Sequence, residues 1–139
     1  LGKVGISESI LTKKSKLNKR DWERIKKHPE IGYLIAKSSP QLAHIAESIL
    51  HHHEWWDGTG YPQGKKGIDI SIEGQIIAIA DVFDALTTRR PYKEAYPIDQ
   101  SLAMLSEQAG THFNPELVEI FTKKREEIVK IYQKHYVTL

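Results

Sequence analysis

Residues 51–62 of this chain read HHHEWWDGTGYP, and they combine two features that together indicate the fold. Three adjacent histidines stand where a helical pattern ends, and a glycine-rich loop with an aromatic ring follows at once. Imidazoles at a helix end are a ready source of metal ligands. Glycines in the loop let a backbone come close to a phosphate or a base. The order of these parts predicts a metal-dependent enzyme that acts on a phosphorylated, nucleotide-type substrate.

The helix that precedes this loop distinguishes the three histidines from one another. Its apolar stripe consists of Leu42, Ile45, Ala46, Ile49 and Leu50. His53 lies three residues after Leu50 and continues the stripe, and His52 lies at its margin. Since His51 follows the polar face, helical geometry predicts that His52 and His53 point inward and that His51 points to solvent. The simpler alternative is a helix end where histidines favour the C-terminal dipole, but two inward neighbours beside this loop favour metal ligands.

The apolar patterns along the chain have helical spacing, and none alternates convincingly with period two. They predict an all-α fold with helices at residues 19–27, 29–37, 40–53, 72–86, 98–108 and 115–135. The expected helix starts are capped by Asn18, Ser39 and Ser71, and the last helix starts at Asn114 and Pro115. The side chains expected to face inward in the first two helices are Trp22, Ile25, Ile31, Leu34 and Ile35. Residues 54–70 form one long irregular stretch, and a loop of that length in a small domain is usually functional.

Asp81 is a further candidate functional residue besides the histidines. Residues 76–83 are apolar except for this carboxylate, and a helix that is apolar all round is normally buried centrally. A buried carboxylate must be hydrogen-bonded, paired with a cation or bound to a metal. On residue grounds, a salt bridge to Arg89 or Arg90 explains the pattern about as well as a metal does.

His28 precedes Pro29, which disfavours helix at His28 and predicts a break between two helices there. Such a position can direct a side chain into a cleft, although an exposed histidine is the commoner outcome. If His28 joins the inward histidines and Asp81, the ligand set contains three imidazoles, a carboxylate and no sulfur. Such a set suits iron, manganese or zinc better than calcium.

Composition limits the remaining possibilities. The chain has 139 residues, which is room for one domain with one core. Its net charge of +2 is too weak to indicate nucleic-acid binding, and no run of 18 apolar residues predicts a membrane span. The absence of cysteine excludes disulfides and thiolate ligands, which suits a reducing compartment.

Several blocks of the sequence, in one order, resemble the signature of the HD-GYP family. Besides HHE and WDGTGYP within residues 52–62, these blocks are GKVGI at 2–6, KHPEIG at 27–32, ADVFDALT at 80–87, RPYK at 90–93 and GTHFNPEL at 110–117. The resemblance covers the chain to about Phe121, and a helical extension to residue 139 follows. The family comprises bacterial metal phosphohydrolases that cleave cyclic di-GMP. The resemblance therefore implies that residues 1–139 belong to one all-α HD-type domain that opens cyclic di-GMP to pGpG, GMP or both.

The resemblance also implies roles for single residues. It places metal ligands at His28, His52, His53 and Asp81, and a lysine that assists the attacking water or the phosphate at Lys3. It places substrate contacts at Gly60, Tyr61, Pro62, Arg90 and Lys93. From the residues alone, Tyr61 and Pro62 could equally stabilise a turn, and the two cations could be solvated surface charges. Divalent iron or manganese is the favoured metal, with zinc as the alternative. Of the other histidines, His112 is expected to be structural, and His44, His51 and His135 are expected at the surface.

The family's His-Asp pair, which precedes its Leu-Gly-Lys segment, has no counterpart because the chain opens at Leu1. We therefore expect the later part of an N-terminally truncated domain, with a weak metal site and slow or no turnover. An upstream receiver or sensor domain, a homodimer and a bacterial cytoplasmic location are also expected. One alternative is a catalytically degenerate module that binds cyclic di-GMP or a protein partner. Another is an HD hydrolase that acts on a different nucleotide.

Overall fold

The structure is a computed structural model, and it describes residues 17–89, 91 and 93–137. Its α-helices are α2 (Lys19–Ile25), α3 (His28–Lys37), α4 (Ala46–His51), α5 (Ile72–Thr87), α6 (Ile98–Glu107), α7 (Pro115–Lys123) and α8 (Arg125–Tyr132). Short 3₁₀ turns lie at Ala43–Ile45 and Gly67–Asp69, and a π-helical turn lies at Gln133–Val137. The predicted all-α fold is confirmed.

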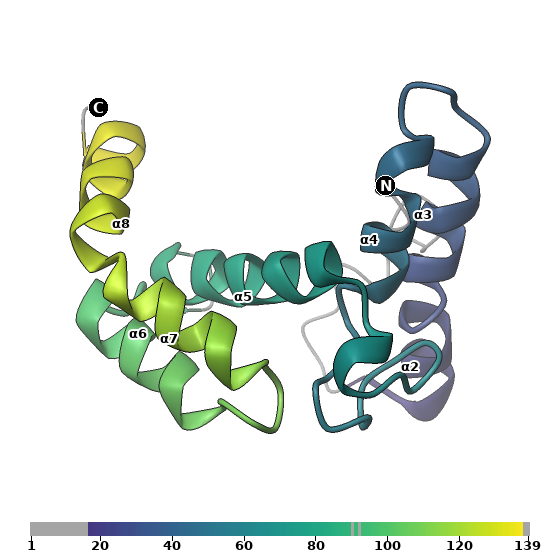
Figure 1. The fold of residues 1–139 in the computed structure, drawn as a ribbon, viewed down its shortest axis with the longest axis horizontal. Coiled ribbons are helices and arrows are strands. Elements are labelled where there is room, and N and C mark those ends of the chain that lie inside the picture. The colour runs from purple at the N-terminus through teal and green to yellow at the C-terminus, as the bar shows by residue number, and fades with distance from the viewer. Residues whose placement is uncertain (1–16, 90, 92, 138–139) are drawn as a thin grey trace.

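Helix α5 lies across the middle of the molecule and connects two groups of helices (Figure 1). Helices α2, α3 and α4, with the loop at residues 52–71, gather at its N-terminal end, and we call this part the histidine end. Helices α6, α7 and α8 gather at its C-terminal end, and we call this part the core end. Along this path α3 packs on α4, α4 on α5, α5 on α6, and α6 on α7.

The hydrophobic core lies between α5 and the core end. Its buried members are Ala78, Ile79, Leu102, Leu105, Phe113 and Val118. Leu105 is fully buried and Phe113 is 2% exposed. Phe83 and Phe121 extend this core with an edge-to-face contact between rings whose centroids are 5.3 Å apart. Burial of these side chains is what holds α6 and α7 on α5.

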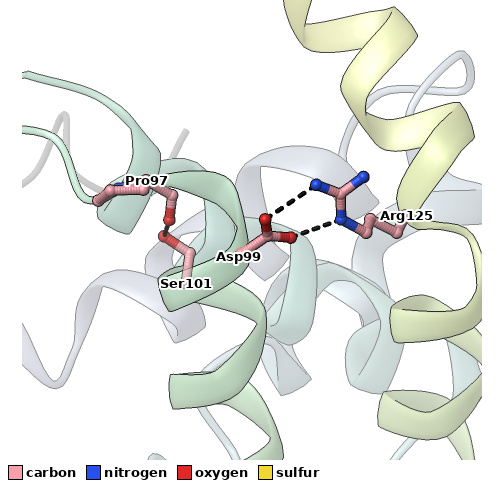
Figure 2. A network of polar contacts seen from close by, with 4 residues as sticks. All are labelled: Pro97, Asp99, Ser101 and Arg125. Carbon is pink, nitrogen blue, oxygen red and sulfur yellow. Dashed lines mark hydrogen bonds and ion pairs between the residues drawn. The ribbon is translucent and has the colours of Figure 1, made fainter.

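A polar contact on the surface ties α8 to the start of α6 (Figure 2). The Arg125 guanidinium donates to both carboxylate oxygens of Asp99, with 2.8 Å between Nη2 and Oδ2. Ser101 is buried within α6, and its hydroxyl donates to the carbonyl oxygen of Pro97 at 3.0 Å. The Asp99–Arg125 pair is exposed, so solvent screens most of its attraction.

Three helix starts follow the residues predicted to set them, whereas the predicted cap Ser39 starts no α-helix, since α4 begins only after Ile45. Asn18 caps α2 through a capping box with Asp21, and the Ser71 hydroxyl accepts a hydrogen bond from the amide of Gly74 in α5. The Asn114 side chain caps α7, and Pro115 occupies its first turn. These three predictions are confirmed, and each depends on interactions within one helical turn.

Two predicted helix bounds were wrong. The helix expected at residues 40–53 begins as a turn and a 3₁₀ segment, and α-helix starts only at Ala46, because hydrogen bonds such as Ile45 N to Leu42 O close shorter rings. The helix expected at residues 115–135 is divided at Lys124, whose amide donates to the carbonyl of Phe121.

The apolar side chains of α2 and α3 correct the prediction of which faces are buried. Trp22 and Leu34 are 47% and 64% exposed, and Ile35 is exposed as well. The buried positions of α3 include Gly32 and Ala36 instead. Small residues there let α3 approach α4 closely, so the contact face is narrower than the apolar stripe of the sequence.

None of the helices in the described part of the chain is long and apolar enough to cross a membrane.

Candidate metal centre

His28 is held at the break between α2 and α3. It is the first residue of α3, it is 4% exposed, and its Nδ1–H donates to the carbonyl oxygen of Ile25 at 2.6 Å. The predicted break between two helices is confirmed, but it falls at Lys26 and Lys27, and His28 itself is already helical. Pro29 follows in the first turn of α3, where its missing N–H costs nothing. The chain therefore turns at His28 and points its imidazole into the interior.

His52 and His53 follow the last residue of α4, and they bring two more imidazoles to His28. Nδ1–H of His52 donates to the carbonyl oxygen of Ile49 at 2.6 Å. The ring centroid of His53 lies 4.0 Å from that of His52 and 4.8 Å from that of His28. One ring nitrogen from each of the three histidines lies within 4.8 Å of the other two. The predicted convergence of these side chains is confirmed, and we call them the histidine cluster.

The donor set of the histidine cluster fits a divalent transition metal. A carbonyl oxygen only accepts, so the proton of His28 and of His52 resides on Nδ1, and the ring lone pair is on Nε2, the nitrogen that could bind a metal. Metal-binding imidazoles in proteins usually donate their other N–H to a carbonyl or carboxylate in this way. Nε2 of His28 is fully buried. These features suit iron, manganese or zinc.

Asp81 lies outside the histidine cluster. Its carboxylate is exposed on α5, and among the described residues the cluster contains no carboxylate. Its charge still reaches the site, because it contributes to the raised pKa of Tyr61. The expectation that α5 is buried on all sides was wrong, since Ile72 and Ile76 are about half exposed. A carboxylate on a partly exposed helix does not need a buried partner, so Asp81 as a ligand stays a prediction.

Tyr61 forms one wall of the histidine cluster. Its ring stacks on His53, with centroids 5.0 Å apart and planes 22° apart, and it meets the edge of His28 at 6.4 Å. The peptide bond between Tyr61 and Pro62 is cis. Burial, and next the negative charge of Asp81, raise the pKa of the Tyr61 hydroxyl. The phenol therefore stays protonated at neutral pH and can donate a hydrogen bond.

Gly60 is required by the close packing of the loop on itself. A Cβ atom at this position would lie 2.3 Å from the amide nitrogen of Trp55 and 2.5 Å from the carbonyl oxygen of His53. The amide of Tyr61 donates to that same carbonyl at 3.1 Å. The absence of a side chain at Gly60 thus lets the backbone that carries Tyr61 rest directly on the backbone that carries His53.

Glu54 organises the loop from inside, a role that the sequence analysis missed. It is 2% exposed, and its two carboxylate oxygens accept hydrogen bonds from the amides of Gln63 at 2.7 Å and Lys65 at 3.0 Å. Hydrogen bonds to a charged acceptor are stronger than neutral ones. The available signal was an acidic residue directly after the histidines and before the glycines.

The prediction that His51 is a surface residue was wrong. His51 is 6% exposed, and its Nδ1 accepts a hydrogen bond from the amide of Ser71. Burial, and next the positive charge of Lys65, lower the pKa of His51, which keeps the ring neutral. The polar face of α4 is covered because the start of α5 packs there, where a Cβ on Gly74 would lie 2.7 Å from the Cβ of His51.

His112 joins the loop to the core end through stacked rings. Its ring lies 4.1 Å from that of Trp55 and 4.0 Å from that of Phe113, with interplanar angles of 15° and 12°. Burial lowers the pKa of His112 to about 4. The imidazole is therefore neutral at physiological pH and acts as an aromatic spacer, as expected of a structural residue.

Two backbone hydrogen bonds strengthen this junction. The amide of Trp56 donates to the carbonyl oxygen of His112 at 3.0 Å, and the amide of Asp57 donates to that of Thr111 at 2.9 Å. The turn between α6 and α7 thus supports the loop that carries Tyr61.

The remaining predicted site residues lie at or beyond the C-terminal end of α5, or outside the described residues. Lys93 Nζ donates to the carbonyl oxygen of Ala85 at 3.0 Å and lies 4.6 Å from the ring centroid of Tyr96. It thus caps the end of α5 in this structure. Lys3 and Arg90 fall outside the described residues.

The fold and the histidine cluster together define an all-helical domain with three converging imidazoles that could hold a metal ion. The sequence model of the HD domain family matches residues 1–117. The cyclic di-GMP phosphodiesterase of Thermotoga maritima is 42% identical over 136 residues, which cover 96% of this chain and 37% of that protein. The 3'3'-cGAMP-specific phosphodiesterase 2 of Vibrio cholerae is 44% identical over 133 residues, covering 94% of this chain and 26% of that protein.

A solved structure supports the fold as well. The crystal structure of a cyclic GMP-AMP specific phosphodiesterase from V. cholerae, V-cGAP3, superposes with a TM-score of 0.63 at 23% identity, covering 94% of this chain and 33% of that one. The chain thus spans about a third of the length of the relatives that it matches. It belongs to the HD domain family, in its HD-GYP branch.

Proposed function

We propose that the domain to which this chain belongs hydrolyses a phosphodiester bond of cyclic di-GMP, giving pGpG, GMP or both, with divalent metal held by the histidine cluster. The observation that carries the proposal is the approach of the ring nitrogens of His28, His52 and His53 to within 4.8 Å of one another. Relatives with 34–44% identity that bear the names of cyclic di-GMP or cGAMP phosphodiesterases support the substrate class.

The residues of the histidine cluster would bind the metal through Nε2 of His28 and His52 and through a ring nitrogen of His53. When bound, a divalent metal lowers the pKa of a coordinated water and offsets charge on the phosphodiester. We favour iron or manganese, with zinc as the alternative, because imidazole donors suit all three. Asp81 is proposed as a further ligand, since its charge acts on Tyr61 at the edge of the cluster.

Tyr61 would position the nucleotide beside the histidine cluster. A phenol keeps its proton at neutral pH, and burial raises the pKa of Tyr61 further, so the hydroxyl can donate to a phosphate oxygen, or the ring can pack against guanine. Gly60 and Pro62 would hold this ring in place, since the loop backbone at Gly60 rests on that of His53. The position of the substrate would therefore be coupled to that of a metal ligand.

Three cations would complete the site. Lys93 is proposed as a phosphate contact, but in this structure it caps the C-terminal end of α5, whereas the histidine cluster lies at the N-terminal end of that helix. Arg90 is proposed as a bidentate phosphate ligand, and Lys3 as the group that assists the attacking water. An upstream receiver or sensor domain, a homodimer and a cytoplasmic location stay predictions of the sequence.

The test is to measure metal content and product formation in the same preparations. The chain is loaded with manganese or iron, its metal is quantified by mass spectrometry, and pGpG and GMP are separated by chromatography after incubation with cyclic di-GMP. His28→Ala and His53→Ala should lose both metal and hydrolysis, whereas the exposed control His44→Ala should retain both. Metal retained at the wild-type level in His53→Ala would contradict the assignment of the cluster. Binding of cyclic di-GMP without any product would favour the degenerate binding module instead.

A further inference from the structure

A groove of about 340 Å³ opens beside the histidine cluster. Tyr61 and Pro62 have a role in the proposed function, but the groove itself has none. It is lined by Glu23, Lys26, Lys27, Glu30, Tyr61 and Pro62. Tyr61 belongs both to the groove, which it lines, and to the edge of the histidine cluster, where its ring stacks on His53. A ligand with one phosphate at the cluster would therefore extend past Tyr61 into this groove.

The charged side chains of the groove come from a continuous stretch of chain around His28. Glu23 lies on α2, Glu30 lies in the first turn of α3, and Lys26 and Lys27 occupy the turn between the helices. All four side chains are exposed. Within the described ranges, none of them forms an ion pair with another. The groove thus presents two separate carboxylates and two separate ammonium groups to whatever enters it.

This mixture of charges does not suit a bare phosphate, which the two carboxylates would repel. It suits a guanine nucleotide, which carries both kinds of partner. The Watson–Crick edge of guanine presents the N1–H and N2–H donors side by side, and a carboxylate accepts both. The phosphate of the same nucleotide is the partner for lysine. A tyrosine and a proline supply a flat apolar wall for the base.

We propose that this groove binds the half of a cyclic dinucleotide that is not being cleaved, and that it selects guanine in that half. Glu23 and Glu30 provide the carboxylates that accept from the guanine edge, and Lys26 and Lys27 face the second phosphate. The inference rests on the proposed function, because it takes a cyclic dinucleotide as the ligand. Beyond that function, the inference assigns base selectivity to Glu23 and Glu30.

Adenine is the informative comparison. Its Watson–Crick edge has an N6–H donor next to the N1 acceptor, so a carboxylate gains one hydrogen bond and faces one lone pair. A glutamine side chain, with one donor and one acceptor, can pair with adenine in bidentate fashion. Replacing glutamate by glutamine should therefore shift the preference from guanine toward adenine, an outcome that simple loss of structure would not produce.

The experiment measures binding to the whole chain in the presence of manganese. The probes are phosphorothioate analogues of cyclic di-GMP, 3'3'-cGAMP and cyclic di-AMP, and calorimetry gives their dissociation constants. The variants are Glu23→Gln, Glu30→Gln and the double substitution, with the exposed Glu107→Gln of α6 as the matched control. We expect the double variant to bind the cyclic di-GMP analogue about 10-fold more weakly and the cyclic di-AMP analogue no more weakly than the wild type does. The control should match the wild type.

A second pair of variants tests the lysines. Lys26→Met and Lys27→Met should lower the affinity for all three analogues by a similar factor, because a lysine–phosphate contact does not depend on the base. The affinity of these variants should also depend less on salt concentration. Manganese binding, measured in the same samples, should be unchanged in every variant.

Two results would overturn the inference in different ways. If the glutamine variants bind all three analogues as the wild type does, or lose all three equally, the groove does not select the base, and the proposed function is untouched. If the wild-type chain binds manganese but none of the dinucleotides, the proposed function fails, and the inference fails with it.

Discussion

The histidine end and the core end are held together by different kinds of interaction, although both pack on the same helix. At the core end, apolar side chains such as Leu105 and Phe113 are buried against α5, and polar contacts such as Asp99–Arg125 remain at the surface. At the histidine end the buried groups include His28, His51 and Glu54. Each of these residues makes at least one hydrogen bond with a backbone atom of the loop or of a neighbouring turn.

Because the two ends are stabilised differently, they should respond differently to substitution. Loss of apolar volume at the core end should lower the free energy of unfolding and leave metal affinity per folded molecule unchanged. Loss of a loop contact at the histidine end should lower both, because the loop backbone carries His53 and Tyr61.

Leu105→Ala should have the largest effect. The side chain is fully buried, and truncation of a buried leucine costs about 3 kcal/mol through lost burial and the cavity left behind. Urea denaturation followed by circular dichroism measures this loss. The control Ile120→Ala, at a position that is 51% exposed, should cost much less. Reduced manganese affinity in the folded Leu105→Ala protein would contradict the division between the two ends.

Gly60→Ala should cost about 2 kcal/mol, since the new Cβ would overlap the backbone of His53 and Trp55 and force the loop to move. It should also weaken manganese binding, because the displaced segment carries a ligand. Gly67→Ala is the matched control. Its φ of +58° carries a strain of about 1 kcal/mol, but a Cβ there meets nothing within 4 Å. Equal metal affinity in the two variants would show that the packing at Gly60 does not position His53.

Glu54→Gln should cost about 2 kcal/mol. The amide group of glutamine has one oxygen, so its nitrogen would face the N–H of Gln63 or Lys65, and one buried donor would lose its acceptor. The exposed Glu107→Gln makes the same chemical change and should leave stability unchanged. A Glu54→Gln protein as stable as the wild type would mean that the loop does not depend on this carboxylate.

His112→Phe should alter the response to acid. The pKa of His112 is lowered to about 4 from 6.5, so between these values the unfolded chain binds a proton that the folded chain does not. The contribution of neutral His112 is therefore present above pH 6.5 and is lost as the pH falls toward 4. It amounts to about 1 kcal/mol, well below the limit set by the full shift, because solvent reaches part of the ring. Denaturation curves at several pH values should fall less steeply for the variant than for the wild type. Parallel curves would contradict this.

Asp99→Asn should have the smallest effect. The ion pair with Arg125 is exposed on both sides, so removing it should change stability little, and less still at high salt. Thermal melts at low and high salt measure the difference. A loss as large as that of Leu105→Ala would show that the surface contact in Figure 2 contributes more to the core end than its exposure implies.

The sequence predicted the features that depend on near neighbours. The caps at Asn18 and Ser71 depend on groups within one turn, and α5, α6 and the start of α7 follow from periodicity and such caps. The convergence of His52 and His53 was predictable from helical spacing, and that of His28 from the resemblance of its block to the HD-GYP signature. No alternating pattern competed with the helical ones.

The misassigned residues have partners far along the chain. His51 is buried because Ser71 and Gly74 cover it, and a helical face drawn from α4 alone cannot include them. Glu54 is fixed by amides of the loop, which follow no periodic pattern. Asp81 is exposed because α5 is not covered on all sides, which its apolar composition could not reveal.

The amides of Trp56 and Asp57 donate to carbonyls in the turn between α6 and α7. These two hydrogen bonds allow the attachment of the loop to be measured separately from global unfolding. Their hydrogens can exchange with deuterated solvent whenever the loop lifts from that turn, even while the helices stay folded. The amide of Leu105 in the core should exchange only through global opening. The ratio of these exchange rates gives the free energy of local opening, and a ligand that seats the loop would slow exchange at Trp56 and Asp57 more than at Leu105.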